Sequence, residues 1–138
     1  MVMTGVHTID SSLNKTKEWL KDVQEACGFE EQEDAYVALR AVLMTLRDRL
    51  PLGECTDFAA QLPLFLAGVY YHEWKPSGKP LKLRHKDEFI AAVREHIPER
   101  MDAERITCAV FAALEKRITS GEITDVKSNL PEEIKDLF

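Results

Sequence analysis

Two glutamates at matching positions are the first candidates for chemistry. Glu54 and Glu122 each follow a glycine, and each is followed two and three residues later by threonine and aspartate. A pair of carboxylates can act as general acid and base. The segment from Thr119 to Glu122, however, has the spacing of a capping box, in which the glutamate bonds free backbone N–H groups at a helix start. We therefore interpret both glutamates as helix-capping residues, although Pro51 stands where the first cap would be.

Arginine and aspartate also recur at matching positions. Arg49 precedes Asp57 by eight residues, and Arg117 precedes Asp125 by the same number. A guanidinium and a carboxylate on either side of a tight turn can bridge two helices with paired hydrogen bonds. We predict two structural ion pairs, each contributing less than about 1 kcal/mol if exposed.

The motifs for metal binding and catalysis are incomplete. His72-Glu73 begins like the His-Glu-x-x-His motif of zinc proteases, but Pro76 occupies the place of the second histidine. Three cysteines lie far apart, without the spacing of a zinc or redox site, at Cys27, Cys55 and Cys108. The sequence therefore predicts no catalytic residue, no metal and no cofactor, and we expect a protein that is not an enzyme.

The segment from Tyr70 to Lys86 combines aromatic rings with positive charge. Five cations and no acid lie between positions 75 and 86, whereas the whole chain has a net charge of -6. Rings beside cations can bind an anion or a partner. Six residues are candidates for this role: Tyr70, Tyr71, Trp74, Lys75, Arg84 and His85. The alternative, which we favour, is a linker whose rings pack between helical units while its lysines face water.

The matching residues belong to a longer internal repeat. Positions 41–63 align without a gap with positions 109–131 at an offset of 68, and ten of the 23 pairs are identical. Upstream, apolar residues at positions 19, 20 and 23 match those at 89, 90 and 93 at an offset of 70. We predict a tandem duplication that covers nearly the whole chain.

Each unit is expected to be helical. Ser11 or Ser12 can cap a first helix and Gly28 can end it. A second helix is expected over about 31–50, because its apolar residues fall on one stripe of the 3.6-residue period, and positions 106–118 repeat that stripe. A third, shorter helix follows in each unit, and a proline after it fits the first turn of a fourth.

The fourth helices differ between the units on one face. Three positions of the first unit align with three acidic positions of the second: Leu64, Phe65 and Gly68 with Glu132, Glu133 and Asp136. Leaving Leu64 and Phe65 in water would forgo about 2 kcal/mol for each side chain. We predict that this face packs against the other unit or, failing that, forms a self-association interface that Gly68 allows to approach closely.

These patterns predict an all-α fold, a tandem duplication of a three- to four-helix unit packed as one compact helical bundle. The expected boundaries are a flexible N-terminus at 1–10, a first repeat at 11–74, a basic connection containing proline and glycine at 75–86, and a second repeat at 87–138.

Several short motifs resemble one known family. They are Leu39-Arg40-Ala41-Val42-Leu43, Leu46-Arg47-Asp48-Arg49-Leu50, Ala60-Gln61-Leu62-Pro63, Tyr70-Tyr71-His72-Glu73-Trp74 with Pro76, and Arg84-His85-Lys86 with Phe89. In this order and spacing they resemble the prokaryotic domain of unknown function 2267 over roughly 19–138. The resemblance implies a helical fold with an internal duplication, and it implies no activity.

Composition limits the remaining function classes. The net charge of -6 disfavours general nucleic-acid binding. The longest nearly apolar run, 62–71, is about half the roughly 20 residues of a membrane span, so we expect no membrane association. The odd cysteine count fits a reducing, cytoplasmic compartment. Our leading hypothesis is a non-enzymatic module that binds a protein partner or self-associates; the alternative is a small-anion or metabolite-binding protein that uses the connection.

Overall fold

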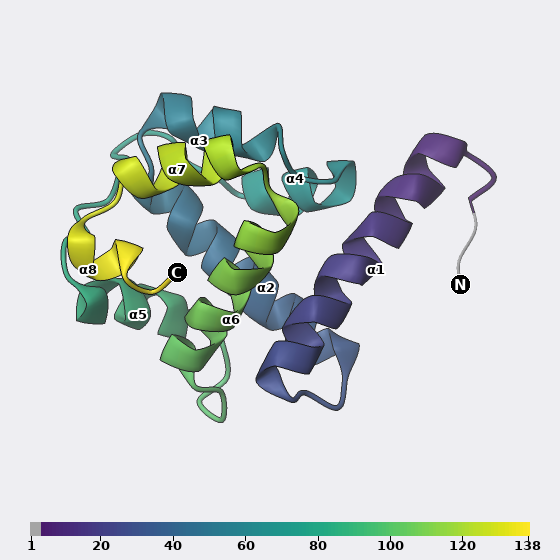
Figure 1. The fold of residues 1–138 in the computed structure, drawn as a ribbon, viewed down its shortest axis with the longest axis horizontal. Helices are drawn as coiled ribbons and strands as arrows, with labels where there is room; N and C mark the ends of the chain where they lie inside the picture. Colours follow the sequence, from purple (N-terminus) through teal and green to yellow (C-terminus); the bar gives the residue numbers. More distant parts are fainter. Residues whose placement is uncertain (1–3) are drawn as a thin grey trace.

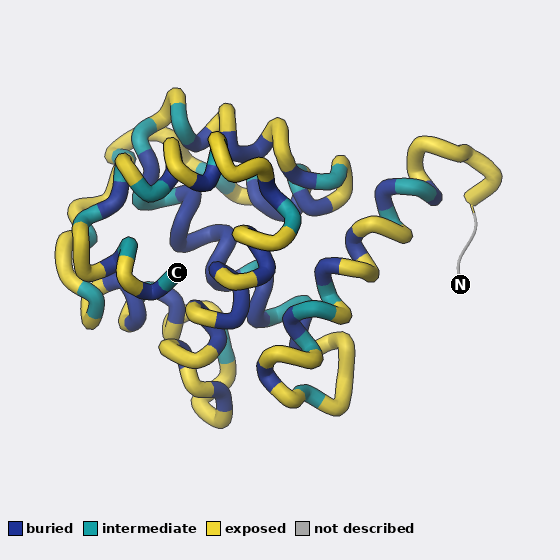
Figure 2. The backbone as a smooth tube through the Cα atoms, in the orientation of Figure 1, coloured by how far each residue is buried: buried dark blue, intermediate teal, exposed yellow. Residues whose placement is uncertain are grey.

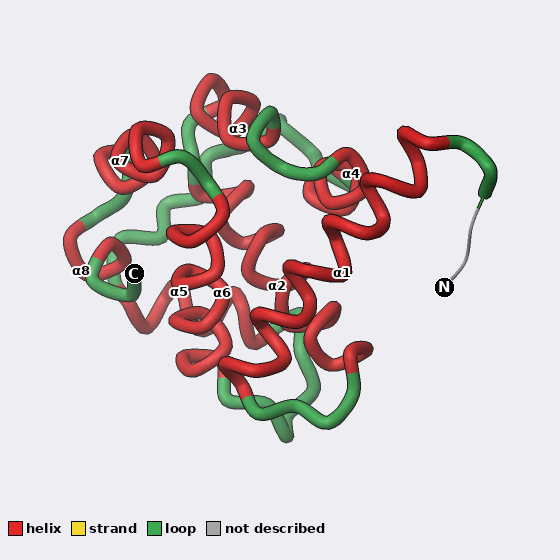
Figure 3. Tube along the Cα trace, turned by 45° about the vertical axis from the view of Figure 1, so that its right-hand side comes forward, coloured by secondary structure: helices red, strands yellow, loops and turns green. Residues whose placement is uncertain are grey.

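The computed structural model describes residues 4–138, and every regular element in that range is an α-helix (Figure 3). The elements in chain order are α1 (His7–Cys27), α2 (Gln32–Arg49), α3 (Leu52–Ala59), α4 (Leu64–Tyr71), α5 (Lys86–Arg94), α6 (Ala103–Arg117), α7 (Ser120–Ser128) and α8 (Glu132–Lys135). The predicted all-helical fold is confirmed for these residues. None of these helices is both long and apolar enough to cross a membrane.

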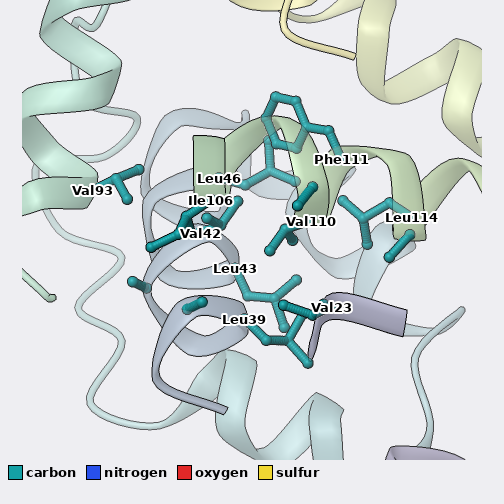
Figure 4. Close-up of a cluster of buried hydrophobic side chains, with 14 of the residues drawn as sticks. Val23, Leu39, Val42, Leu43, Leu46, Val93, Ile106, Val110, Phe111 and Leu114 are labelled. Carbon is teal, nitrogen blue, oxygen red and sulfur yellow. The ribbon is translucent and has the colours of Figure 1, made fainter. Parts of the chain in front are cut away.

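The core forms around α2, which is buried on almost every side (Figure 2). All seven residues from 41 to 47 are buried, as is expected for a helix surrounded by other helices. Helices α1, α4, α5 and α6 all pack against α2. In Figure 4, Val42 and Leu46 of α2 lie among Val93 of α5 and Ile106 and Val110 of α6. One core therefore joins both halves of the chain.

Helix ends in the two halves follow the 68-residue offset. Helices α2 and α6 end at Arg49 and Arg117, and α3 and α7 begin three residues later. Pro63 and Pro131 immediately precede α4 and α8. The leucines that the repeat predicts to be buried are buried: Leu46, Leu62, Leu114 and Leu130. The halves still differ in length, because α6 begins at Ala103 rather than at position 100 and α8 has only four residues.

The contacts between helices are also nearly symmetrical. Helix α1 packs against α2, α4 and α6, and α5 packs against their counterparts α6, α8 and α2. Helix α2 contacts its counterpart α6, and α3 contacts α7, so that α3 and α7 lie side by side in Figure 1. Two related units facing each other would produce this pattern. Their origin by duplication stays a prediction.

The N-terminal boundary differs from the prediction. Helix α1 begins at His7 after Val6, rather than after Ser11 or Ser12, so positions 7–10 are helical and not a flexible terminus. Residues 1–3 lie outside the described part of the chain. Asp10 is held by Thr4, whose backbone N–H and hydroxyl both donate to its carboxylate at 2.8 Å. The predicted end is correct, because Gly28 adopts a left-handed conformation with φ 69° at the end of α1.

Ser12 has a different role from the predicted one. Its hydroxyl oxygen accepts a hydrogen bond from the backbone N–H of Phe65 at 2.7 Å. The first N–H groups of a helix have no partner within the helix, and Pro63 has no side-chain acceptor for them. Ser12 therefore caps α4 from a neighbouring helix.

The connection at 75–86 is fixed to the C-terminal end of α2. The backbone N–H of Leu81 donates to the carbonyl oxygen of Asp48 at 2.7 Å, and Nε of Arg49 donates to the carbonyl oxygen of Leu83 at 2.7 Å. The last carbonyls of a helix have no partner within it. These two bonds satisfy one such carbonyl and tie the connection to α2.

Arg47 ties the C-terminal end of α4, which precedes the connection, to α2. Its side chain is 4% exposed, and Nη1 donates to the carbonyl oxygens of Tyr70 and His72, each at 3.0 Å. Asp48 supplies the counter-charge, with Nε of Arg47 at 2.9 Å from Oδ1. One buried guanidinium thus binds the carbonyl end of α4 and joins it to α2.

Replacing Arg47 with methionine should destabilise the fold. Arg47→Met keeps an apolar side chain in place but leaves two carbonyls and Asp48 without their donor, at a cost on the order of 3 kcal/mol. Arg94→Met is the control, because Arg94 is an exposed arginine of α5, and it should change stability by less than about 0.5 kcal/mol. Urea denaturation followed by circular dichroism measures both; equal effects would contradict the role given to Arg47.

Candidate functional site

Two large apolar side chains of α4, in the first half of the chain, are exposed. Leu64 is 64% exposed and Phe65 is 43% exposed. Together with side chains of α2 they line a groove of about 460 Å³, formed by Tyr36, Arg40, Leu64, Phe65, Gly68, Val69 and His72. The groove is apolar along α4, and Arg40 and His72 place polar groups at its edge. We call it the α4 groove.

The packing of α4 explains why these side chains face water. Leu66, Val69 and Tyr70 are buried against α1 and α2, so the remaining apolar residues of this short helix point outward. The prediction that the other half of the chain covers Leu64 and Phe65 is therefore wrong. The predicted use of this face for self-association stays a prediction.

Gly68 is not packed closely against any other element of residues 4–138. A Cβ atom built on it would meet no other atom within 4 Å. Glycine inside a helix costs about 1 kcal/mol relative to alanine. The packing of the described residues does not explain why a glycine stands here. A glycine would, however, allow a second surface to approach α4 closely.

The corresponding place in the second half is a charged hollow. At the offset of 68, Phe65 corresponds to Glu133 and Tyr36 to Glu104. These two glutamates help line a hollow of about 610 Å³ at the start of α5. Nδ1 of His85 lies 2.7 Å from Oε2 of Glu133, and Nζ of Lys86 lies 3.0 Å from Oε2 of Glu104. The hydrogen bond with Glu133 raises the pKa of His85. The charged side chains of this hollow therefore satisfy one another, and the apolar ones of the α4 groove have no such partners.

The six residues predicted to bind an anion or a partner do not form one site. Tyr70 is fully buried, and its hydroxyl donates to the carbonyl oxygen of Cys55 at 3.0 Å. The prediction that Tyr70 contacts a ligand is wrong, because its ring is part of the core. Lys75, Arg84 and His85 are exposed, and of the six only His85 lines one of the two hollows described above.

The aromatic residues form a series that leads out of the core. Ring centroids are 5.4 Å apart for Phe58 and Tyr70, 5.4 Å for Tyr70 and Tyr71, and 5.6 Å for Tyr71 and Trp74. Tyr71 and Trp74 are half-buried against the core. These distances are typical of stabilising aromatic pairs. The rings therefore pack against one another within the first unit, whereas the linker interpretation expected them between the units.

The two predicted ion pairs are absent from the described residues. Asp57 of α3 and Asp125 of α7 are exposed. Arg49 instead binds the carbonyl of Leu83, and Arg117 pairs with Asp22 and with Glu18 of α1. The spacing of eight residues did not show which way each aspartate faces.

Glu54 and Glu122 also differ from the prediction. The hydroxyl of Thr119 accepts from the backbone N–H of Glu122 at 3.3 Å, so the N-cap exists. The carboxylate of Glu122 does not complete a capping box within the described residues. Glu54 and Glu122 face each other instead where α3 contacts α7. The two glutamates occupy corresponding positions of the sequence repeat, and this is the signal that could have predicted their contact.

Fold and surface together describe a class of protein: an all-helical chain with one core shared by two similar halves and an apolar groove on one of them. The chain matches the family model described as "Uncharacterized conserved protein (DUF2267)" over residues 16–137, and it belongs to this family. The resemblance inferred from the motifs is thus confirmed. No curated protein matches the chain.

Substitution of the observed partner and of the predicted partner of Arg117 tests which aspartate this arginine binds. Asp22→Asn should cost about 1 kcal/mol, because Asp22 is only 15% exposed and holds both Arg117 and Lys116. Asp125→Asn, at an exposed position, should cost less than about 0.5 kcal/mol. The hydrogen bond from Arg117 lowers the pKa of Asp22 below its ordinary 3.8.

The pH dependence of this effect has a defined sign. A lowered folded-state pKa gives stability above the unfolded-state pKa, and that stability is lost as the pH falls through the folded-state value. The difference in unfolding free energy between wild type and Asp22→Asn should therefore be full at pH 7 and shrink below pH 3.8. A larger effect for Asp125→Asn at pH 7 would contradict the assignment.

Proposed function

We propose that the protein is a non-enzymatic interaction module that acts through the α4 groove and associates with a second copy of itself. The observation that carries the proposal is the exposure of Leu64 and Phe65, at 64% and 43%, beside a glycine that internal packing does not require. Burying two such side chains in a partner would gain about 2 kcal/mol each. We expect it to act in the cytoplasm, where its three free cysteines would stay reduced.

Two further large apolar side chains are exposed at the start of α1. Val6 is 50% exposed and Ile9 is 44% exposed, on turns of α1 that project from the rest of the molecule in Figure 1. The hydrogen bond from Phe65 to Ser12, one turn after Ile9, keeps the start of α4 against this part of α1. Four of the six large exposed apolar side chains within 4–138 thus belong to two adjacent helix starts. Exposed apolar surface of this kind is typical of interaction sites.

The comparison between the halves supports a specialised first half. We infer that both halves descend from one helical unit, because helix ends and helix contacts follow the repeat. At equivalent places the second half has a glutamate paired with His85, and the first half has Phe65 facing water. An ancestral surface that became polar in one copy and stayed apolar in the other would leave one docking face per chain.

A second candidate function is binding of a small anion by the basic connection. Burial lowers the pKa of Arg49, and nearby Arg84 lowers it further. Two guanidiniums this close favour an anion between them. The candidate ranks second because Tyr70, which was expected to contribute, is buried.

The proposed function is tested by molecular mass in solution. Light scattering should give a mass above that of the monomer for the wild type, and Phe65→Glu should return the monomer by placing a charge in the apolar contact. Leu52→Glu is the matched control: Leu52 is 45% exposed on α3, away from the groove, so this variant should keep the wild-type mass.

The results of these measurements distinguish self-association through the α4 groove from binding of an anion. A monomeric wild type at concentrations up to about 1 mM would overturn self-association, since that limit corresponds to only about 4 kcal/mol of binding. Equal dissociation by both variants would show that the effect is not specific to α4. Stabilisation of the wild type by inorganic phosphate, abolished in Arg84→Ala, would support the second candidate instead.

A further inference from the structure

The contact between α3 and α7 contains two carboxylates without enough donors. Glu54 and Glu122 are the third residues of these helices. Oε2 of Glu54 and Oε1 of Glu122 are buried atoms with no hydrogen-bond partner. The side-chain amide of Asn129 donates to Oε1 of Glu54 at 3.3 Å, which leaves both buried oxygens unsatisfied. A buried acceptor without a donor costs about 1 to 3 kcal/mol.

The surrounding charges increase this cost when both groups are ionised. The groups that face Glu54 most strongly are Glu122 and Asp125 from α7 and Asp57 from α3, and all three are acidic. Burial, followed by the interaction with Glu122, raises the pKa of Glu54 to about 8. Two adjacent carboxyl groups in such a setting can share one proton, as other carboxylate pairs do.

A proton between the two groups would supply the missing donor. One carboxyl O–H can donate to the facing carboxylate, so the pair carries one negative charge and both buried oxygens take part in one hydrogen bond. A metal ion is a poorer explanation, because no group of three ligating side chains among residues 4–138 could hold one.

We propose that Glu54 and Glu122 share one proton and thereby form a proton-dependent clasp between α3 and α7. Loss of the proton leaves two like charges in contact, and the resulting repulsion separates the two helices. Because α3 belongs to the first half and α7 to the second, the clasp links the two halves, whose helices α3 and α7 lie side by side in Figure 1. This inference does not depend on the α4 groove.

The sign of the pH effect follows from proton linkage. Between the ordinary glutamate pKa of 4.5 and about 8, the folded protein binds more protons than the unfolded chain. Stability from this pair is therefore complete below pH 4.5 and decreases as the pH rises through about 8.

The direct test is a carbon-detected NMR titration of the glutamate side chains in the full chain. In the wild type, one step with an apparent pKa near 8 should move the signals of both Glu54 and Glu122. In Glu122→Gln, the amide can donate to Glu54, and the titration of Glu54 should fall from about 8 toward its ordinary value of 4.5. Glu54→Gln should abolish the alkaline step. Asp57→Asn is the matched control and should keep the alkaline step.

A second measurement tests whether the helices separate. Amide hydrogen exchange in α3 and α7, corrected for its intrinsic pH dependence, should accelerate at least about tenfold between pH 6.5 and pH 9 in the wild type and not in Glu54→Gln. Wild-type glutamates that titrate independently near 4.5 would overturn the shared proton. An alkaline titration without faster exchange would overturn the clasp.

Discussion

The fold depends on the burial of α2 against α6. Each of these two helices has too much apolar surface to face water. Leu39, Val42, Leu43 and Leu46 of α2 are fully buried, and each contributes about 2 kcal/mol. Helices of both halves supply this burial, because α1 and α4 pack against α2 from the first half and α5 and α6 from the second. The chain therefore folds as one unit whose other helices are arranged around this pair.

That arrangement determines which residues meet. Glu54 and Glu122, at corresponding positions of the sequence repeat, meet where α3 contacts α7. Other corresponding positions lie on separate surfaces and can differ. Phe65 and Glu133 occupy equivalent places, one open to water and one paired with His85.

The sequence predicted the helices because they follow from local rules. Periodic apolar residues, the left-handed Gly28 and Pro63 before α4 determine elements through nearest neighbours. The sequence did not predict contacts in which a side chain could bind any of several residues far along the chain. Arg47 binds the end of α4, 23 and 25 residues away, and no spacing rule distinguishes it from an ordinary surface arginine.

The two arginines of the repeat illustrate the limit most clearly. Arg49 and Arg117 occupy the same position, but Arg117 has the carboxylate of Asp22 beside it, and at the offset of 70 the counterpart of Asp22 is Ala92. Without that acid, Arg49 binds the carbonyl of Leu83 and helps to hold the connection. The residue on the neighbouring helix, Asp22 or Ala92, thus decides whether the arginine forms an ion pair or anchors the connection. Identical residues in a repeat predict the backbone better than they predict the partners of their side chains.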